Sequence, residues 1–309
     1  MSDAISCINK IICGDALAEM KKLPSDSIAL IVTSPPYWNL VDYNAEGQYG
    51  RGSYEDYLEE MQKVWAEAQR ILEPNGKLAI VTPIVPLTKE QDSSIHTRKL
   101  LNINSDIEAK ILNSPSTKKL NRFSLYIWQK QTTKKMFGSY PYPPNIYEDN
   151  TIEFINVFVK DGKPKKLPKE VKEASKMNQE EWLNLSMQVW PIMPSDIQRK
   201  GGHPAPFPLE IPRRLIVMYS FKAVPNYNFD GDIVLDMFNG SGTTTLAAFQ
   251  MSRRYIGIDI NSDYCAIAES RIENTKIKGK YKILIDKIRM PKKEETADNS
   301  QPTLVFKGV

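Results

Sequence analysis

The sequence predicts an α/β fold, a doubly wound and mostly parallel Rossmann-like sheet with helices on both faces. Short apolar runs without alternation, at residues 28–32, 78–81 and 233–235, are typical of strands buried on both faces. Helical patterns lie between such runs, which indicates β–α–β units with right-handed crossovers. The first run is closed by Pro35 and Pro36, which cannot extend a central strand. A chain of 309 residues suits one large domain with insertions, or about two domains.

The predicted elements alternate along the chain. An apolar run at 11–13 precedes a helical pattern over residues 16–23. A longer helix is predicted from Ser53, an N-cap with an acidic residue three positions later, to Leu72. The later elements are strands at 123–128, 152–159 and 233–235, a helix from about Thr243, and a strand at 255–258.

Two segments interrupt this alternation. Residues 86–122 are polar and rich in Ser, Asn and Lys without a clear period, and residues 161–200 are irregular. We therefore predict two inserts in one core domain. The core domain consists of residues 1–85, 123–160 and 201–290, the inserts are 86–122 and 161–200, and 291–309 form a flexible tail.

The positive charge of the chain is clustered. The formal net charge is +4, from 41 basic and 37 acidic residues. Between Pro86 and Lys135 there are ten Lys and Arg against four acids, and residues 276–293 hold eight against Asp286 alone. Such clusters suit a polyanion such as nucleic acid, although solvated lysine-rich loops have the same composition.

Cysteine and histidine counts exclude several chemistries. Cys7, Cys13 and Cys265 are too few and too scattered for a disulfide framework or a CxxC metal site. His96 and His203 are the only histidines, so no multi-histidine metal centre is expected. No apolar run approaches the ~18 residues of a membrane helix, and the N-terminal segment lacks a signal-peptide core. The expected location is therefore the cytoplasm.

A glycine-rich loop at residues 236–244 follows one predicted strand and opens a helix. Its glycines allow a tight turn and a close approach of the backbone to a ligand, with the helix amides facing it. Asp259 ends the next strand, where a carboxylate can accept hydrogen bonds from both ribose hydroxyls. No lysine follows the glycines as in a P-loop, and Thr245 replaces the third glycine of a dinucleotide fingerprint. The loop suits a nucleoside ligand, and a mere packing turn is the alternative.

Residues 33–38, with the sequence TSPPYW, follow another buried strand. The two prolines hold their carbonyl groups rigidly, and the Ser34 hydroxyl is a further acceptor. Tyr37 and Trp38 provide aromatic planes. Two acceptors and a stacking face suit a planar base with an exocyclic amine. A strand terminator with buried aromatic residues is the alternative.

Together, TSPPYW at 33–38 and FNGSGTTT at 238–245 resemble the DNA amino-methyltransferases that use S-adenosylmethionine, in the circularly permuted, β-type motif order. Gly14 and Asp15 resemble the family's acidic motif at the cofactor's adenine. Met237 is a departure, because the family often has proline there. Residues 137–145 resemble the motif near the target base, and 203–208 with 213–216 the element beside the cofactor's methionine moiety. The resemblance covers most of residues 11–85, 123–160 and 201–275.

The resemblance implies a role for each loop. In a doubly wound sheet, the two loops can face each other across one crevice where the strand order reverses. The Ser34 hydroxyl and the Pro35 carbonyl would accept the two N–H bonds of the amine, whose lone pair attacks the methyl group. Tyr37 would stack on a base flipped out of the duplex. The implied catalytic residues are Ser34, Pro35, Pro36 and Tyr37, and the implied cofactor-binding residues are Asp15, Thr33, His203, Pro204, Phe207, Asp236, Phe238, Asn239, Gly240, Ser241, Gly242, Thr243, Thr244 and Asp259.

The implied substrate is double-stranded DNA, and the family suggests a cognate restriction endonuclease and a homodimer as further partners. Serine at position 34 implies cytosine N4 as the methylated atom, with adenine N6 as the alternative. The two inserts are the predicted target-recognition segments, in which lysines contact phosphates and Arg, Asn or Gln read base edges. Candidate DNA contacts are Trp38, Arg98, Lys118, Lys119, Arg122, Tyr140 and Arg199.

Three other functions agree less well with the sequence. Methyltransferases of a protein glutamine amide or of RNA also have a Pro-Pro-Tyr loop, but it usually begins with Asn and follows the unpermuted order. A nicotinamide dehydrogenase would use Asp259 for its ribose but would leave TSPPYW unexplained. A catalytically silent DNA-binding module would not need both loops intact.

Overall fold

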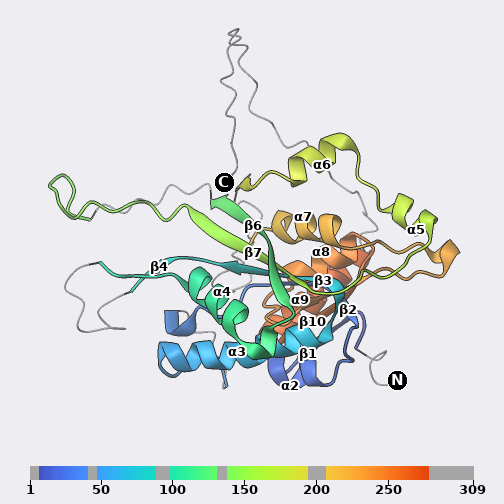
Figure 1. The fold of residues 1–309 in the computed structure, drawn as a ribbon, viewed down its shortest axis with the longest axis horizontal. Helices are drawn as coiled ribbons and strands as arrows, with labels where there is room; N and C mark the ends of the chain where they lie inside the picture. The colour runs from blue at the N-terminus through green and yellow to red at the C-terminus, as the bar shows by residue number, and fades with distance from the viewer. Residues whose placement is uncertain (1–6, 41–46, 88–97, 131–137, 194–206, 278–309) are drawn as a thin grey trace, which may run out of the picture.

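The structure is a computed structural model that describes residues 7–40, 47–87, 98–130, 138–193 and 207–277 (Figure 1). An eight-stranded sheet runs through these residues in the order β1-β10-β9-β2-β3-β7-β6-β8. Neighbours from β1 to β3 are parallel, β7 is antiparallel to β3 and β6, and β8 is parallel to β6. The predicted mostly parallel α/β sheet is therefore confirmed. The strands are β1 (Lys10–Cys13), β2 (Ile28–Thr33), β3 (Leu72–Thr82), β6 (Leu120–Lys130), β7 (Ile152–Lys160), β8 (Val189–Ile192), β9 (Ile233–Asp236) and β10 (Arg254–Asp259).

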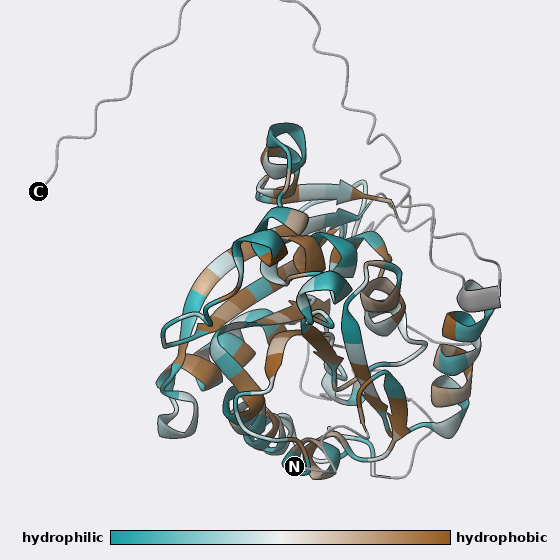
Figure 2. Cartoon of the chain, turned by 90° about the vertical axis from the view of Figure 1, so that its right-hand side faces the viewer, coloured by the Kyte–Doolittle hydropathy of each residue, from teal (hydrophilic) through white to brown (hydrophobic). Residues whose placement is uncertain are grey.

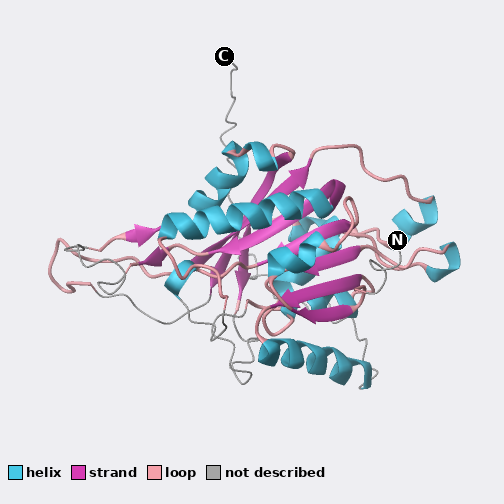
Figure 3. Ribbon diagram, turned by 90° about the horizontal axis from the view of Figure 1, so that it is seen from below, coloured by secondary structure: helices cyan, strands magenta, loops and turns pink. Residues whose placement is uncertain are grey.

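Helices cover both faces of the sheet, as Figures 1 and 3 show. One face carries α2 (Ala16–Lys21), α3 (Tyr54–Ile71) and α4 (Ile103–Asn113), and the other carries α7 (Glu210–Tyr219), α8 (Thr243–Gln250) and α9 (Ser262–Ile277). None of the described helices is long and apolar enough to cross a membrane. The smaller elements are α5 (Lys169–Ala174), α6 (Gln179–Leu185), the 3₁₀ helices η1 (Trp38–Leu40), η2 (Pro115–Thr117) and η5 (Pro225–Tyr227), and the short strands β4 (Val85–Pro86) and β5 (Leu100–Leu101).

Strand β2 is buried along its whole length, as its unbroken apolar run predicts. Leu30 and Val32 pack among residues of α7 and α8, whereas Ile31 packs among residues of α2 and α3. Burial of each such side chain contributes about 1.5–3 kcal/mol relative to exposure. Figure 2 shows hydrophobic residues concentrated on the central strands. The chain that leaves β2 at Thr33 therefore starts from a rigid position.

The segment over residues 103–117 forms α4 and η2, so the statement that residues 86–122 have no clear period is wrong for this part, whereas their assignment as an insert stays a prediction. Ile103, Ile107 and Ile111 are spaced by four residues and fully buried on one side of α4, which packs against α3 and β3. The polar residues on the outer face of α4 dominate its composition, and they concealed this short period.

The expectation of irregular structure over residues 161–200 is also wrong in its described part. The segment forms α5 and α6 and adds β8 to the edge of the sheet. Trp190 and Ile192 of β8 point into the core, while Val189 and Pro191 are exposed. The alternation of exposed and buried residues in β8 extends over four residues only, and Pro191 argues against a strand. The sequence pattern was therefore too short to predict this edge strand.

The parallel strands end at one edge of the sheet, which we call the carboxyl edge. Its strand ends are Cys13, Thr33, Thr82, Asp236 and Asp259. Because β7 is antiparallel to β3, with residues 82 and 154 paired, the chain before β7 also lies at this edge. The β4 segment and the β6–β7 hairpin project together from the sheet in Figure 1. The carboxyl edge therefore carries both of these projections.

Candidate active site

The two motif-bearing loops meet at the carboxyl edge. β2 and β9 are adjacent strands, with residues 31 and 235 paired. The Thr33 Oγ1 atom at the end of β2 donates a 2.7 Å hydrogen bond to Oδ1 of Asp236 at the end of β9. Thr244, at the start of α8, donates from Oγ1 to the Val32 carbonyl at 3.3 Å. The predicted meeting of these loops, about two hundred residues apart in sequence, is confirmed.

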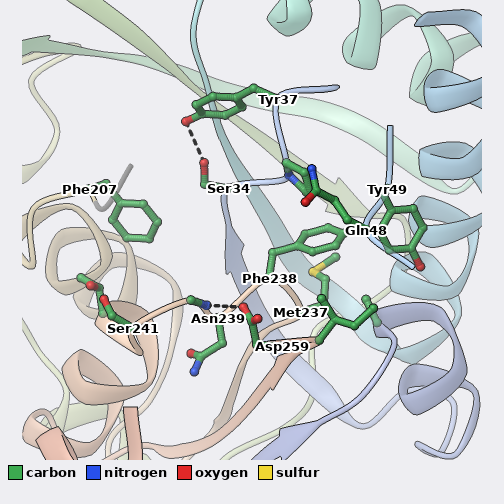
Figure 4. A pocket seen from close by; sticks show the side chains of 15 residues that line it. Ser34, Tyr37, Gln48, Tyr49, Phe207, Met237, Phe238, Asn239, Ser241 and Asp259 are labelled. Carbon is green, nitrogen blue, oxygen red and sulfur yellow. Dashed lines mark hydrogen bonds between the residues drawn. The ribbon is translucent and has the colours of Figure 1, made fainter. Parts of the chain in front are cut away.

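A single cavity lies between the loops (Figure 4). It contains about 790 Å³ of free space, part of which is open to solvent. Ser34 and Tyr37 line one side, and Asp259 belongs to the other. Pro36 also lines the cavity. The remaining lining residues are Ala16, Gln48, Tyr49, Phe207, Met237, Phe238, Asn239, Gly240, Ser241, Thr243 and Ile260.

The glycine-rich loop is shaped by its contacts with β10 and α9. Gly242 has φ of +80°, and a Cβ atom there would lie 2.6 Å from the Cβ of Ala268. Gly240 also has positive φ, and its N–H donates to Asp259 Oδ2 at 2.6 Å. Asn239 N–H donates to the Ile258 carbonyl at 2.9 Å. These contacts hold the backbone of the loop against the end of β10 and open it toward the cavity.

Asp259 presents a partly desolvated carboxylate to the cavity. Burial raises the pKa of its carboxyl group above the ordinary value, while N–H donors from Asn261 and Gly240 act in the opposite direction. Each carboxylate oxygen accepts one of these bonds and retains a further lone pair. The Asp259 side chain can therefore accept hydroxyl donors from a bound ligand.

Tyr49 and Phe238 form an aromatic wall that the sequence interpretation only half identified. Their ring centroids are 5.7 Å apart in an edge-to-face arrangement. The Tyr49 hydroxyl donates to Asp15 Oδ2 at 2.7 Å, and Asp15 Oδ1 caps α2 by accepting from Ala18 N–H. Asp15 thus holds Tyr49 in place rather than lining the cavity itself. Gly47 and Gly50, on either side of Gln48 and Tyr49, were the sequence signal for a tightly turned loop, and both have positive φ.

The turn at residues 34–37, which we call the serine–proline corner, is held by three hydrogen bonds. Ser34 Oγ lies 3.1 Å from the Val81 carbonyl oxygen and 2.9 Å from the Tyr37 hydroxyl. The Pro36 carbonyl accepts a 2.7 Å bond from the Tyr57 hydroxyl. Pro35 is buried and does not line the cavity, whereas Pro36 does. Tyr57 of α3 therefore fixes the turn from behind.

Trp38 is not available for stacking on a base, which corrects its assignment as a DNA contact. Trp38 and Tyr37 are equally buried, each 9% exposed, but Trp38 does not line the cavity, and its Nε1 donates to the Gly52 carbonyl at 3.0 Å. Its ring contacts Tyr54 edge-to-face, with centroids 5.5 Å apart. Trp38 packs in the core behind the corner, so Tyr37 is the aromatic residue of this loop that faces the cavity.

The predicted cofactor residues divide by position. Those that line the cavity are Phe207, Phe238, Asn239, Gly240, Ser241, Thr243 and Asp259. Those that the structure places behind the lining, as supports of the loops, are Asp15, Thr33, Asp236, Gly242 and Thr244. His203 and Pro204 lie outside the described residues, as does Arg199.

Three of the predicted DNA contacts lie away from the cavity. Lys118, Lys119 and Arg122 are at the edge opposite the carboxyl edge, because Leu120 at the start of β6 pairs with the end of β7. Arg122 pairs there with Glu108 at 2.6 Å. These three residues therefore lie away from a base held at Ser34, and Arg122 is not placed to read it. The phosphate contacts that the sequence predicts for Lys118 and Lys119 stay predictions.

Arg98 and Tyr140 do belong to the projections at the carboxyl edge. Arg98 forms an ion pair with Glu148 and lies 4.8 Å above the Tyr147 ring, so it joins the two projections. Asn150 Nδ2 adds a 3.3 Å bond to the Ile84 carbonyl. Tyr140 is 69% exposed. Arg98 thus stabilises this surface, whereas Tyr140 is displayed on it.

Asp236 links the loops through a carboxyl group that is fully desolvated. Burial raises the pKa of Asp236 from 3.8 to about 7, against hydrogen bonds from Thr33, Thr244 and the Phe238 N–H. The folded protein thus holds a proton that the unfolded chain releases above about pH 4. The stability associated with this proton is complete below pH 4 and is lost as the pH rises to about 7.

We expect Asp236→Asn to raise the melting temperature by several degrees at pH 8 and to change it little at pH 5. The amide removes a buried charge but keeps an oxygen for Thr33 and Phe238, and the difference is on the order of 2 kcal/mol. Thermal unfolding at both pH values measures it, with the exposed Asp230→Asn as control. An equal effect at the two pH values would contradict the assignment.

Comparison with known proteins agrees with this geometry. A family model for DNA methylases, of the N6/N4 methyltransferase type, matches residues 28–270. The type II methyltransferase M.MjaI of Methanocaldococcus jannaschii is 31% identical over 308 residues, covering 88% of this chain and 93% of that protein. The DNA adenine methyltransferase YhdJ of Escherichia coli K12 is 28% identical over 275 residues, covering 85% and 82%.

Among solved structures, TTHA0409 of Thermus thermophilus, crystallised in complex with S-adenosyl-L-methionine, has a TM-score of 0.67 and 30% identity. The match covers 86% of this chain and 93% of that one. Within the described residues, no group of three or more His, Cys, Asp or Glu side chains is placed to hold a metal ion. The chain belongs to the S-adenosylmethionine-dependent DNA amino-methyltransferases.

Proposed function

We propose that this protein methylates N4 of cytosine in double-stranded DNA, with cofactor and flipped base held in the cavity between the two loops. The observation that supports this most is the placement of Ser34 and Asp259 on the same cavity from opposite loops. A carboxylate suited to ribose hydroxyls thereby faces a hydroxyl acceptor suited to an amine. Catalysis by positioning requires that the cofactor and the target base be held in the same cavity.

The residues on the Asp259 side fit the cofactor. S-adenosylmethionine would supply a methyl group bound to a sulfonium, which transfers to a nucleophile as S-adenosylhomocysteine leaves. Asp259 accepts the ribose hydroxyls through its remaining lone pairs, and burial strengthens these bonds. Phe238 and Ile260 give apolar contact for the adenine, and Phe207 lines the same cavity.

The residues on the Ser34 side fit the target base. Ser34 lines the cavity, and its Oγ accepts an N–H bond of the exocyclic amine. Pro35, predicted as the source of the second acceptor, does not line the cavity, so the acceptor role passes to Ser34 alone. The hydrogen bond to Ser34 draws the nitrogen toward a tetrahedral arrangement and directs its lone pair at the methyl group. Tyr37 offers its ring to the flipped base. No strong base is needed, because the methylated ammonium loses its proton readily.

Cytosine is favoured over adenine because serine begins the corner. In the resemblance drawn from the sequence, serine accompanies cytosine N4, whereas Asp or Asn more often accompanies adenine N6. YhdJ, named as an adenine methyltransferase, is also a relative. Adenine N6 is therefore the second candidate, and the same cavity geometry serves it.

We place the DNA-reading surface on the projections from the carboxyl edge, at residues 83–87, 98–102 and 138–150. The β6–β7 hairpin is closed by a 2.7 Å bond from Ser139 N–H to the Asn145 carbonyl and displays Tyr140 and Tyr142, 69% and 74% exposed. Exposed aromatic residues can stack on bases or pack in a groove. Names of relatives as type II methyltransferases support a cognate restriction endonuclease as partner. A homodimer stays a prediction.

Replacing both Tyr140 and Tyr142 with Ala should weaken DNA binding about tenfold, the loss expected when ~1.4 kcal/mol of aromatic contact is removed. Fluorescence anisotropy with labelled duplex DNA measures the affinity, and calorimetry checks that cofactor affinity is kept. Tyr227→Ala, 49% exposed near the opposite edge of the sheet, is the matched control. Equal losses in both variants would refute this surface.

The proposed function is tested by methyl transfer from radiolabelled S-adenosylmethionine to unmethylated phage DNA, to tRNA and to a protein extract. Digestion of the labelled DNA to nucleosides separates the two candidate products. The proposal predicts label in N4-methyldeoxycytidine. Label in N6-methyldeoxyadenosine would replace cytosine by adenine, and label only in tRNA or protein would overturn the proposal.

A further inference from the structure

The Ser34 hydroxyl is held between an obligatory acceptor and a second hydroxyl. The Val81 carbonyl oxygen, 3.1 Å away, can only accept, so the Ser34 proton points to it. The 2.9 Å bond to Tyr37 then requires the Tyr37 hydroxyl to donate. A serine hydroxyl can normally donate or accept, but here its lone pairs alone remain for the cavity.

The Val81 carbonyl cannot move away from Ser34 without breaking the sheet. Val81 lies in β3, is fully buried and pairs with Ile155 of β7. The Tyr37 hydroxyl, by contrast, is at the end of a side chain that lines the cavity, and Figure 4 shows its bond to Ser34 across the cavity wall. Of the two partners of Ser34, Tyr37 is the one that a ligand can displace.

We propose that Val81 fixes Ser34 as an acceptor and that the Tyr37 hydroxyl occupies the place of one amine N–H until the target base displaces it. This inference rests on the proposed function and deepens it. Cytosine and adenine bring an amine donor to Ser34 and can replace Tyr37. Thymine and guanine bring a carbonyl oxygen against the serine lone pairs and cannot. The Val81 carbonyl is thus a positioning group that selects bases with an amine at the position of cytosine N4 or adenine N6, where thymine and guanine have a carbonyl oxygen.

Tyr37→Phe tests the displacement directly, because it removes the internal donor and keeps the ring. The base then enters without breaking a hydrogen bond, so kcat/KM on unmethylated phage DNA should rise about two- to tenfold. The gain should appear in KM rather than kcat, because the bond is already broken once the base is bound. Tyr37→Ala, which also removes the ring, should lower kcat/KM.

A fall in kcat/KM for Tyr37→Phe, with wild-type DNA methylation intact, would overturn this inference and leave the proposed function standing. Absence of DNA methylation by the wild type would overturn both. Cofactor titration of each variant confirms that the site is folded, since a merely structural role of the tyrosine hydroxyl would weaken cofactor binding as well.

Base selection gives a second measurement that does not depend on turnover. Once the methylated sequence is known, duplexes with cytosine or uracil at the target position are bound to the wild type and to Ser34→Ala. Any effect of the mispair on flipping is common to both proteins and cancels in the ratio. The preference for cytosine should fall at least fivefold in Ser34→Ala, and an unchanged ratio would overturn the role of Ser34 as a fixed acceptor.

Discussion

Ser34→Ala should lower kcat by about 10²–10³ while cofactor and DNA affinity stay close to those of the wild type. The substitution removes an acceptor that acts on the amine as it becomes a nucleophile, but it removes no contact on the Asp259 side of the cavity. It also removes the bonds that Tyr37 and Val81 make to Ser34. Single-turnover methylation with saturating cofactor measures the rate, and calorimetry measures cofactor binding.

Ser27→Ala is a matched control for Ser34→Ala. Ser27 precedes β2 at its other end, and its hydroxyl bonds only locally, to the Pro24 carbonyl at 2.7 Å. We expect wild-type kinetics from this variant. Wild-type turnover in Ser34→Ala would contradict the assigned role, as would a rate loss that is matched by an equal loss of cofactor affinity.

Asp259→Asn should raise the dissociation constant for S-adenosylmethionine by about 10- to 100-fold. Hydrogen bonds to a charged acceptor contribute about 1.5–3 kcal/mol each, and the amide keeps one oxygen in place of two. Its amide nitrogen also faces the Gly240 or the Asn261 N–H, each of which now donates to the carboxylate. Isothermal titration with S-adenosylhomocysteine, the product, measures the affinity without turnover.

The control for Asp259→Asn is Asp263→Asn, an exposed carboxylate in the first turn of α9. It makes the same chemical change four residues away and should leave cofactor affinity unchanged. Unaltered affinity in Asp259→Asn, or a similar loss in both variants, would show that the ribose does not bind at Asp259.

The sequence predicted the site well where the chain is locally determined. Unbroken apolar runs identified β2 and β9 as buried strands, and Thr33 and Asp236 end them side by side. Parallel strands must end at a common edge, so loops far apart in sequence could be placed together without knowing their side-chain contacts. The backbone at residues 240 and 242 has positive φ, and the glycines of the motif at these two positions predicted such a tight turn.

The parts that the sequence did not reveal depend on tertiary contacts. Trp38 stands beside Tyr37 in the motif, but its indole N–H finds the Gly52 carbonyl and turns the ring into the core. Asp236 has the residue type of a ligand-binding group, yet it joins the two loops from behind. Tyr49 reaches the cavity only because Asp15 anchors its hydroxyl. None of these side-chain contacts follows from a repeating pattern in the sequence.

Clustered charge was also a poor guide to position. Lys118, Lys119 and Arg122 come at or just before the start of β6, and the antiparallel pairing of β6 with β7 sends this end of the strand away from the cavity. The reversal of direction between β3 and β7 cannot be derived from composition. It places the hairpin with Tyr140, rather than the lysine-rich segment, at the carboxyl edge.

Sequencing of DNA from cells that express the wild type or Ser34→Ala tests the whole account most directly. Modified bases are called at single-nucleotide resolution, which reports base identity and recognition sequence together. We expect N4-methylcytosine at one short sequence throughout the wild-type sample and a near absence of it with Ser34→Ala. Unmodified DNA in the wild-type sample, or equal modification in both, would contradict a methyl transfer that takes place between the serine–proline corner and Asp259.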